Sequence, residues 1–182
     1  MLNVAINGFG RIGRSALKLI LKNKGMKLVA INDLGDINNL AYLLKFDSVQ
    51  GRYDKVVKVV GNNLVVGSTK IPVYKETEPE KLPWKNLKVD VVLECTGVFT
   101  KKEDAERHLK AGAKKVIISA PTKSEGVVTV VRSVNDAKAK GQKIVANASC
   151  TTNCIAPIMA VIDEVFGVEK ALLSTVHATT AS

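Results

Sequence analysis

The fold follows from the stretch Leu2-Asn3-Val4-Ala5-Ile6-Asn7-Gly8-Phe9-Gly10-Arg11-Ile12-Gly13-Arg14. Residues 2–6 are apolar and short enough for a strand, and Ile12, Ala16, Leu19 and Ile20 recur at helical spacing. Between them, Gly8 permits a tight turn, Gly10 lets the backbone approach a pyrophosphate, and Gly13 lets the helix pack on the strand. The helix N-terminus offers N–H groups to phosphates. This order of strand, glycines and helix indicates a dinucleotide-binding unit.

A second apolar strand, residues 27–32, ends at an acidic residue that suits NAD. Asp33 lies 20 residues past Gly13, near the ~20 expected of the acid that binds the ribose 2′-hydroxyl. A carboxylate accepts a hydrogen bond from that hydroxyl and would repel a 2′-phosphate. NAD is therefore expected rather than NADP. The alternative, a flexible glycine turn without a ligand, leaves the flanking strands, helix and acid unexplained.

The remaining chain alternates strands and helices. Expected strands are 89–95, 114–119, 127–131 and 144–146, with helices at 36–46 and 102–111, a loop at 47–52, and hairpin strands within 55–74 inserted at the sheet edge. This pattern predicts an α/β fold with a Rossmann-type, doubly wound, mostly parallel sheet. Ligands collect at the carboxyl ends of such strands, which puts Asp33, Thr96, Ser119 and Cys150 on one rim.

A second motif, Ala148-Ser149-Cys150-Thr151-Thr152-Asn153-Cys154, lies between a strand and an amphipathic helix. The hydroxyls of Ser149, Thr151 and Thr152 are candidate N-caps. A thiol at the positive end of a helix dipole favours the nucleophilic thiolate. The alternative is that Cys150 is a small buried hydrophobe. Pro157 is expected to kink a helix that starts at Cys150.

An expected strand at 170–176 can return to the thiol and deliver His177, which would pair with the thiolate and move a proton. His108 is interpreted as a histidine on an exposed helix face. Cys154 is interpreted as buried filler, because no second pair of metal ligands accompanies it, and Cys95 as structural. No metal site is expected. A thiol that adds to an aldehyde gives a thiohemiacetal, whose hydride can pass to NAD and leave a thioester.

The composition describes a chain of 182 residues, 46% hydrophobic and 24% charged, typical of globular proteins. Three cysteines favour a reducing, cytoplasmic location. Neither a membrane span nor a signal peptide is expected. The net charge of +10 suits anionic ligands. A nucleic-acid role is disfavoured, because the lysines are dispersed and few aromatic residues accompany them.

The motif around Cys150, extended through Ile155-Ala156-Pro157, resembles the signature of phosphorylating glyceraldehyde-3-phosphate dehydrogenases. Resemblance extends to the glycine-rich stretch and to Ile31-Asn32-Asp33-Leu34, Glu94-Cys95-Thr96-Gly97-Val98-Phe99 and Val176-His177-Ala178-Thr179-Thr180. It implies NAD-dependent oxidative phosphorylation of D-glyceraldehyde 3-phosphate to 1,3-bisphosphoglycerate, a glycolytic step. It also implies a homotetramer for a complete chain.

The resemblance assigns roles to individual residues. Cys150 would be the nucleophile, and His177 would activate it. NAD would contact Arg11, Ile12, Asp33 and Ser119 in addition to Gly8, Gly10, Gly13 and Thr96. The triose phosphate and inorganic phosphate would contact Ser149, Cys150, Thr151 and Thr180. Two departures stand out: Thr77, whose backbone is still expected to contact NAD, replaces an arginine that is usual before Asp-Pro, and Ser133 replaces a glycine.

The resemblance also implies a chain nearly twice as long. The expected organisation is an NAD-binding domain at 1–149 and, at 150–182, the beginning of an incomplete α+β catalytic domain. The 182-residue chain is accordingly interpreted as truncated after its His-Ala-Thr-Thr segment, with little or no activity alone. Erythrose-4-phosphate dehydrogenase is the alternative enzyme, and a non-catalytic nucleotide- or RNA-binding fragment is the alternative of another class.

Overall fold

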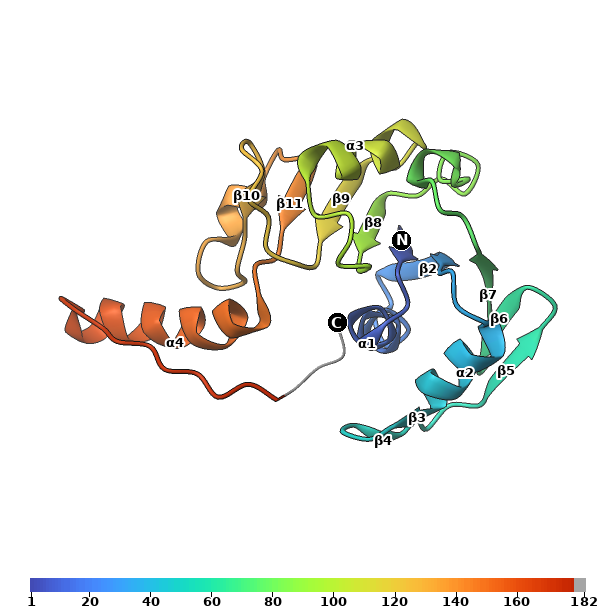
Figure 1. Cartoon of the computed structure of the whole chain (residues 1–182), viewed down its shortest axis with the longest axis horizontal. Coiled ribbons are helices and arrows are strands. Elements are labelled where there is room, and N and C mark those ends of the chain that lie inside the picture. Colours follow the sequence, from blue (N-terminus) through green and yellow to red (C-terminus); the bar gives the residue numbers. More distant parts are fainter. Residues whose placement is uncertain (179–182) are drawn as a thin grey trace.

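The computed structural model describes residues 1–178 as an open twisted sheet with helices on both faces and a long helix projecting from one end (Figure 1). The helices are α1 (Arg11–Ile20), α2 (Ile37–Lys45), α3 (Lys102–Lys110) and α4 (Cys150–Phe166). Short 3-10 turns lie at Pro79–Lys81 and Asp136–Ala139.

The main sheet has the strand order β10-β11-β9-β8-β1-β2-β7-β6-β5. Its strands from β10 to β7 are mutually parallel, β6 pairs antiparallel with β7, and β5 pairs antiparallel with β6. Their bounds are β1 (Leu2–Asn7), β2 (Met26–Asn32), β5 (Val57–Val60), β6 (Asn63–Val66), β7 (Thr69–Tyr74), β8 (Val91–Glu94), β9 (Lys115–Ile118), β10 (Val128–Thr129) and β11 (Ile144–Ala146). The predicted α/β, doubly wound sheet and its edge hairpins are confirmed.

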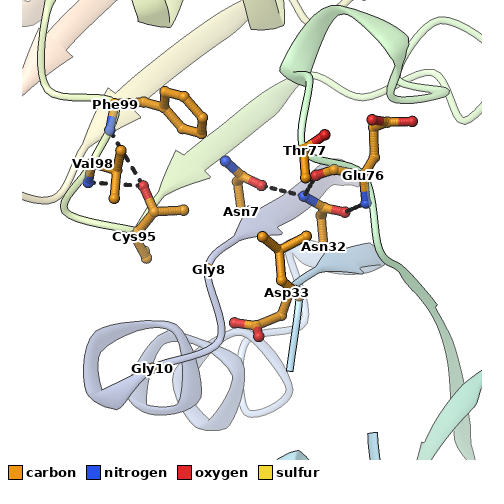
Figure 2. A pocket seen from close by; sticks show the side chains of 12 residues that line it. Asn7, Gly8, Gly10, Asn32, Asp33, Glu76, Thr77, Cys95, Val98 and Phe99 are labelled. Carbon is orange, nitrogen blue, oxygen red and sulfur yellow. Dashed lines mark hydrogen bonds between the residues drawn. The ribbon is translucent and has the colours of Figure 1, made fainter. Parts of the chain in front are cut away.

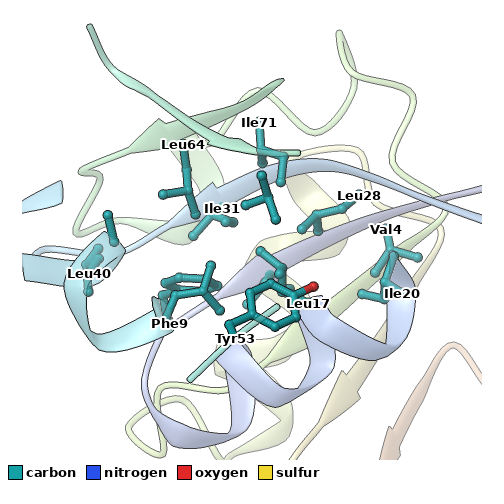
Figure 3. Close-up of a cluster of buried hydrophobic side chains, with 14 residues drawn as sticks. Val4, Phe9, Leu17, Ile20, Leu28, Ile31, Leu40, Tyr53, Leu64 and Ile71 are labelled. Atoms are coloured by element: carbon teal, nitrogen blue, oxygen red, sulfur yellow. The ribbon is translucent and has the colours of Figure 1, made fainter. Parts of the chain in front are cut away.

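Each face of the sheet buries its own hydrophobic core, because successive strand residues point to opposite faces. Val4 and Ile6 of β1 face a cluster that includes Leu17 of α1 and Leu44 of α2 (Figure 3). Ala5, between them, faces the second cluster, which holds Trp84 from the segment before β8 and Ala105 from α3. The side chains of Ala5 and of Ala30, in β2, are small, so the other side chains of the second cluster can pack close to the sheet.

The buried stripe of α1 is rotated from the predicted one. Gly13, Leu17 and Ile20 are buried, whereas Ile12 and Leu19 are exposed. The cause is Gly13 itself: a Cβ there would lie 2.2 Å from the carbonyl oxygen of Gly8. The side of the helix that carries Gly13 therefore has to face the β1–α1 turn.

His108 is fully buried, so the prediction of an exposed histidine was wrong. It lies on the same face of α3 as Ala105, three residues earlier, and that face covers the sheet. Its ring can be buried because the indole of Trp84 and the carboxylate of Glu94 hydrogen-bond its two nitrogens.

Smaller differences occur in the loops and strand ends. The expected loop at 47–52 contributes to a separate two-stranded hairpin, β3 (Phe46–Asp47) with β4 (Gly51–Arg52). β10 is much shorter than the predicted strand 127–131. Ser133, where the related family has glycine, adopts a left-handed backbone with φ of 65°, a conformation that glycine adopts without steric cost.

The helix α4 continues past Pro157, which lies inside it. Proline removes one N–H from the helix ladder, and the structure accommodates that loss within a continuous helix. None of the α4 side chains is buried. Its predicted apolar face is therefore uncovered by the described residues, and Phe166 is 82% exposed.

Residues 167–178 form an irregular tail, so the predicted strand at 170–176 was wrong. A strand needs a neighbour to pair with its N–H and C=O groups, and none of the described strands lies beside this segment. The tail instead runs back along α4 (Figure 1).

The close contact at Gly13 gives a stability prediction. Gly13→Ala should lower the free energy of unfolding by about 1–3 kcal/mol, since its Cβ would press on backbone that cannot turn aside. Gly10→Ala is the matched control, because a Cβ there meets no atom within 4 Å. Urea unfolding of both variants measures the difference, and equal destabilisation by both would contradict the packing argument.

Candidate active site

The glycine-rich turn is held by Asp33 at the end of β2. Asp33 Oδ2 accepts a hydrogen bond from the N–H of Phe9 at 2.6 Å, and Oδ1 accepts one from the N–H of Gly35 at 2.8 Å. Gly8 has φ of 89°, and a Cβ there would lie 2.6 Å from the Thr96 nitrogen. The turn therefore packs directly on the residues that follow β8.

The N-terminus of α1 is suited to an anion. Gly10 is the N-cap and provides no capping side chain, and the first turn has no acidic residue. The N-cap thus supplies no side-chain acceptor to the first N–H groups of the helix, which carry the positive end of its dipole. A Cβ on Gly10 would meet open space, which is the room that a closely approaching phosphate requires.

A pocket of about 360 Å³ opens above this turn at the carboxyl ends of β1, β2 and β8 (Figure 2). Five of the residues predicted to bind NAD line it: Gly8, Gly10, Asp33, Thr77 and Thr96. A dinucleotide site is expected at this edge of a parallel sheet. The acid for a ribose hydroxyl and the helix terminus for phosphate also fit NAD.

Four other predicted NAD residues lie outside this pocket. Arg11 and Ile12 are exposed in the first turn of α1, and Gly13 is buried behind them. Ser119 lies beside Cys95 and hydrogen-bonds its thiol. Burial raises the Cys95 pKa to about 11 despite this hydrogen bond, so Cys95 remains an uncharged thiol at neutral pH.

Several lining residues were not predicted as ligand contacts. They are Asn7, Asn32, Leu34, Glu76, Cys95, Val98 and Phe99. Asn7 and Asn32 could have been found, because an amide at the carboxyl end of a buried parallel strand is an unusual residue there. The others lie in loops whose course depends on contacts between distant segments.

The second part of the site is the N-terminus of α4. Ser149 is its N-cap, and the Ser149 hydroxyl accepts a hydrogen bond from the Thr152 N–H at 3.0 Å. Asn153 Nδ2 donates to the carbonyls of Asn147 and Ser149 at 2.5 and 2.9 Å. These contacts fix the turn before Cys150, whose side chain is exposed. The alternative of a buried Cys150 is therefore wrong.

Cys150 and His177 lie together although the expected strand between them is absent. The Cys150 sulfur is 3.3 Å from His177 Nε2. This hydrogen bond is the main cause that lowers the Cys150 pKa, and contacts with Thr151 add to it. The His177 pKa is raised, first by the carbonyl of Ala178 at 2.7 Å from Nδ1 and then by Cys150, while the charge of Arg11 lowers it.

Both pKa shifts favour a thiolate–imidazolium pair. The lowered thiol pKa extends the thiolate to lower pH, and the raised imidazole pKa keeps the ring charged to higher pH. The pair is lost when acid protonates the sulfur or when alkali deprotonates the ring. Such a thiolate can attack a carbonyl carbon, and the ring can exchange a proton with the adduct.

The remaining predicted residues have mixed outcomes. Thr151 contacts the Cys150 thiol, whereas Thr180 lies outside the described residues. Cys154 is exposed, so its interpretation as buried filler was wrong; it lies on the uncovered side of α4. Within residues 1–178, no three His, Cys, Asp or Glu side chains gather as a metal site would require.

Comparison with known proteins agrees with this geometry. Residues 2–102 match the model of the glyceraldehyde 3-phosphate dehydrogenase NAD binding domain, and residues 149–182 match that of the family's C-terminal domain. The chain belongs to the glyceraldehyde 3-phosphate dehydrogenase family. Residues 2–102 thus carry the NAD-binding domain of that family, which identifies NAD as the cofactor.

Among its relatives, glyceraldehyde-3-phosphate dehydrogenase of Geobacillus stearothermophilus is 54% identical over 97% of this chain and 53% of the relative. That of Clostridium acetobutylicum is 51% identical over 99% and 54%, and glyceraldehyde-3-phosphate dehydrogenase 1 of Bacillus subtilis is 50% identical over 97% and 53%. The chain therefore spans about half the length of the curated relatives it matches. No helix within residues 1–178 has the length and apolar character needed to cross a membrane.

The Cys150–His177 contact predicts how thiol reactivity depends on pH. In a Cys154→Ser background, alkylation of Cys150 by iodoacetamide should reach its half-maximal rate below the pH typical of a free cysteine. His177→Ala removes the main cause of the lowered pKa. It should move that midpoint to higher pH and slow the reaction several-fold at pH 7.

Rapid-quench mass spectrometry across a pH series measures these rates. Cys150→Ser is the control that should abolish labelling, because Cys95 remains protonated. An unchanged midpoint in His177→Ala would contradict the proposed pairing.

Proposed function

We propose that this chain is the NAD-binding part of an enzyme that oxidises D-glyceraldehyde 3-phosphate, with phosphate, to 1,3-bisphosphoglycerate. The observation that carries the proposal is the Cys150–His177 pair at the start of α4, in a chain whose sheet has at its carboxyl edge a pocket that suits NAD. The family match supports the substrate, because the relatives named above are glyceraldehyde-3-phosphate dehydrogenases. Residues 1–149 would form the NAD domain, and 150–182 would begin the catalytic domain.

The Cys150 thiolate would attack the aldehyde carbon of the substrate and form a carbon–sulfur bond. The imidazolium of His177 would donate its proton to the carbonyl oxygen and leave a thiohemiacetal. His177 would then withdraw the hydroxyl proton as the carbon loses a hydride and becomes a thioester. When bound, NAD supplies the acceptor for that hydride. Attack by phosphate on the thioester carbon would release the acyl phosphate and regenerate the Cys150 thiolate.

Hydroxyl and charged groups around the sulfur support a phosphorylated substrate. Thr151 lies next to the thiol, and Ser149 and Thr180 are the other proposed substrate contacts. Arg11 is near enough to lower the His177 pKa through its charge. A positive group at this place would also favour an anionic substrate.

The complete enzyme is proposed to be a cytoplasmic homo-oligomer, a tetramer by analogy with the family. The uncovered apolar face of α4 supports additional packing, since Ile158, Ile162 and Val165 are exposed on it.

Cofactor choice can be tested on the 182-residue chain. Calorimetry should show NAD binding at least about tenfold tighter than NADP, since the Asp33 carboxylate would repel a 2′-phosphate. Asp33→Asn should narrow this preference by lowering NAD affinity and removing the repulsion. Asp36→Asn, the N-cap of α2, is the matched control because it lies outside the pocket and asparagine is also a good N-cap. Tighter binding of NADP by the unchanged chain would contradict the proposal.

Catalysis requires a chain of full length, obtained by joining residues 1–182 to the matching remainder of the Geobacillus stearothermophilus relative. NADH formation from glyceraldehyde 3-phosphate and phosphate should fall by at least roughly a thousandfold in Cys150→Ser. Cys154→Ser should retain activity, because its exposed sulfur has no partner in the mechanism. Activity that survives Cys150→Ser, or a preference for erythrose 4-phosphate, would overturn the proposed chemistry or substrate.

A further inference from the structure

A chain of buried polar side chains begins behind the NAD pocket, on the α3 side of the sheet. The indole Nε1 of Trp84 donates a hydrogen bond to His108 Nδ1 at 3.0 Å. His108 Nε2 lies 3.0 Å from Glu94 Oε2, at the end of β8. All three side chains are at most 1% exposed. The site described above uses none of them.

From Glu94 the chain continues to one wall of the pocket. Asn7 Nδ2 donates to the same carboxylate oxygen, Oε2, at 2.6 Å, and Asn32 Nδ2 donates to Asn7 Oδ1 at 2.7 Å. Asn32 then holds the backbone of Glu76 by accepting from its N–H at 2.8 Å and donating to its carbonyl at 2.9 Å. Figure 2 shows Asn7, Asn32 and Glu76 joined in this way beside Thr77.

The other carboxylate oxygen reaches the opposite wall. Glu94 Oε1 accepts hydrogen bonds from the N–H of Thr96 at 2.8 Å and from its hydroxyl. The Thr96 oxygen in turn accepts from the N–H of Val98 at 3.1 Å and that of Phe99 at 3.4 Å. One carboxylate thus connects two of the loops that line the pocket, one at residues 76–77 and the other within residues 95–99.

The directions of these hydrogen bonds are fixed by chemistry. An indole N–H can only donate, so His108 Nδ1 must accept and the ring proton must be on Nε2. That N–H then donates to Glu94. A carboxylate can accept at both oxygens, and the Glu94 carboxylate receives four donors, from His108, Asn7 and twice from Thr96. Asn7 consequently has to present its oxygen to Asn32, which in turn presents its own oxygen to the Glu76 N–H.

We propose that Glu94, with His108 and Trp84 behind it, is the positioning group that sets both walls of the NAD pocket through this one-way chain of hydrogen bonds. The proposal deepens the proposed function and rests on NAD binding in this pocket. Glu94, His108 and Trp84 are positioning residues, because they act through Asn7, Asn32 and Thr96, which line it.

Glutamine at position 94 tests this directly because it keeps the shape and replaces one oxygen by a donor. If its NH₂ faces Thr96, it opposes a backbone N–H that cannot turn. If it faces Asn7 and His108, it opposes the Asn7 NH₂, and the imidazole can accept from it only by moving its proton to Nδ1. That proton would then oppose the indole N–H of Trp84. Glu94→Gln combined with Trp84→Phe removes the conflict at the imidazole, because phenylalanine has no N–H, and in this orientation leaves the Asn7 amide as the opposed donor.

The experiment measures the NAD dissociation constant by calorimetry and the midpoint of thermal unfolding for the 182-residue chain and its variants. Glu94→Gln should weaken NAD binding about tenfold, as expected for losing one or two buried hydrogen bonds. The double variant should recover about threefold or more of that loss, which a merely structural role would not produce. Nitrogen-15 NMR should show His108 as the Nε2–H tautomer in the unchanged chain and as Nδ1–H in the double variant.

The matched control is Glu80→Gln. Glu80 also contacts α3 from outside, through Arg107 Nε at 2.6 Å, but it is partly exposed and does not line the pocket. Its NAD affinity should stay within about twofold of the original.

An Nδ1–H tautomer in the unchanged chain would overturn the inference, as would NAD affinity within about twofold of the original in a folded Glu94→Gln variant. If that variant does not fold, Trp84→Phe is the deciding test, because without the indole N–H the His108 proton can occupy either ring nitrogen. Weaker NAD binding by Trp84→Phe then supports the inference, and unchanged binding refutes it. Failure of the unchanged chain to bind NAD would instead refute the proposed function.

Discussion

The contact between Gly13 and Gly8 is the constraint on which the site depends. A Cβ at Gly13 would lie 2.2 Å from the Gly8 carbonyl oxygen, so α1 sits directly on the turn that leaves β1. Because of this contact, the first turn of α1, whose N-cap residue makes no side-chain hydrogen bond, lies beside the carboxyl end of the sheet. Asp33 then holds the turn from the neighbouring strand through the Phe9 N–H. The pocket therefore depends on direct backbone contact between Gly13 and Gly8, because a larger residue at position 13 would push α1 away from the turn.

Parallel pairing of the strands brings further residues to the edge of the sheet at which this turn lies. Strands β2, β1, β8, β9 and β11 are parallel, so the residues that follow them emerge at one edge of the sheet although they are far apart in sequence. Asp33 and Thr96 reach the pocket for this reason. Ser119 and Cys150 follow strands farther along the same edge, and the position of Cys150 is completed by Ser149, which caps α4.

What could be predicted from the sequence depended on short-range physics. The glycine spacing, the strand-ending Asp33 and the thiol near a helix N-terminus each concern neighbours in the chain, and each pattern has a single sterically reasonable outcome. The failures concern partners that lie far away. Most residues next to His108 in its helix are charged, so the sequence pattern predicts an exposed side chain. Trp84 and Glu94, from other segments, nevertheless hydrogen-bond both of its ring nitrogens. Cys154 and the segment 170–176 were expected to be covered or paired, and no described residue does either.

The two histidines show why residue type alone does not reveal function. His108 is enclosed by groups that fix one proton on its ring: an indole that can only donate and a carboxylate that accepts. Hydrogen bonds at both ring nitrogens therefore hold the ring and its proton in one arrangement, which suits a positioning role. His177 lies exposed between a carbonyl oxygen and a thiol that can lose its proton. Because both neighbours favour added positive charge on the ring, its pKa is raised, and the ring can gain and release a proton during a reaction. The partners, rather than the imidazole, separate the fixed histidine from the one that can take part in proton transfer.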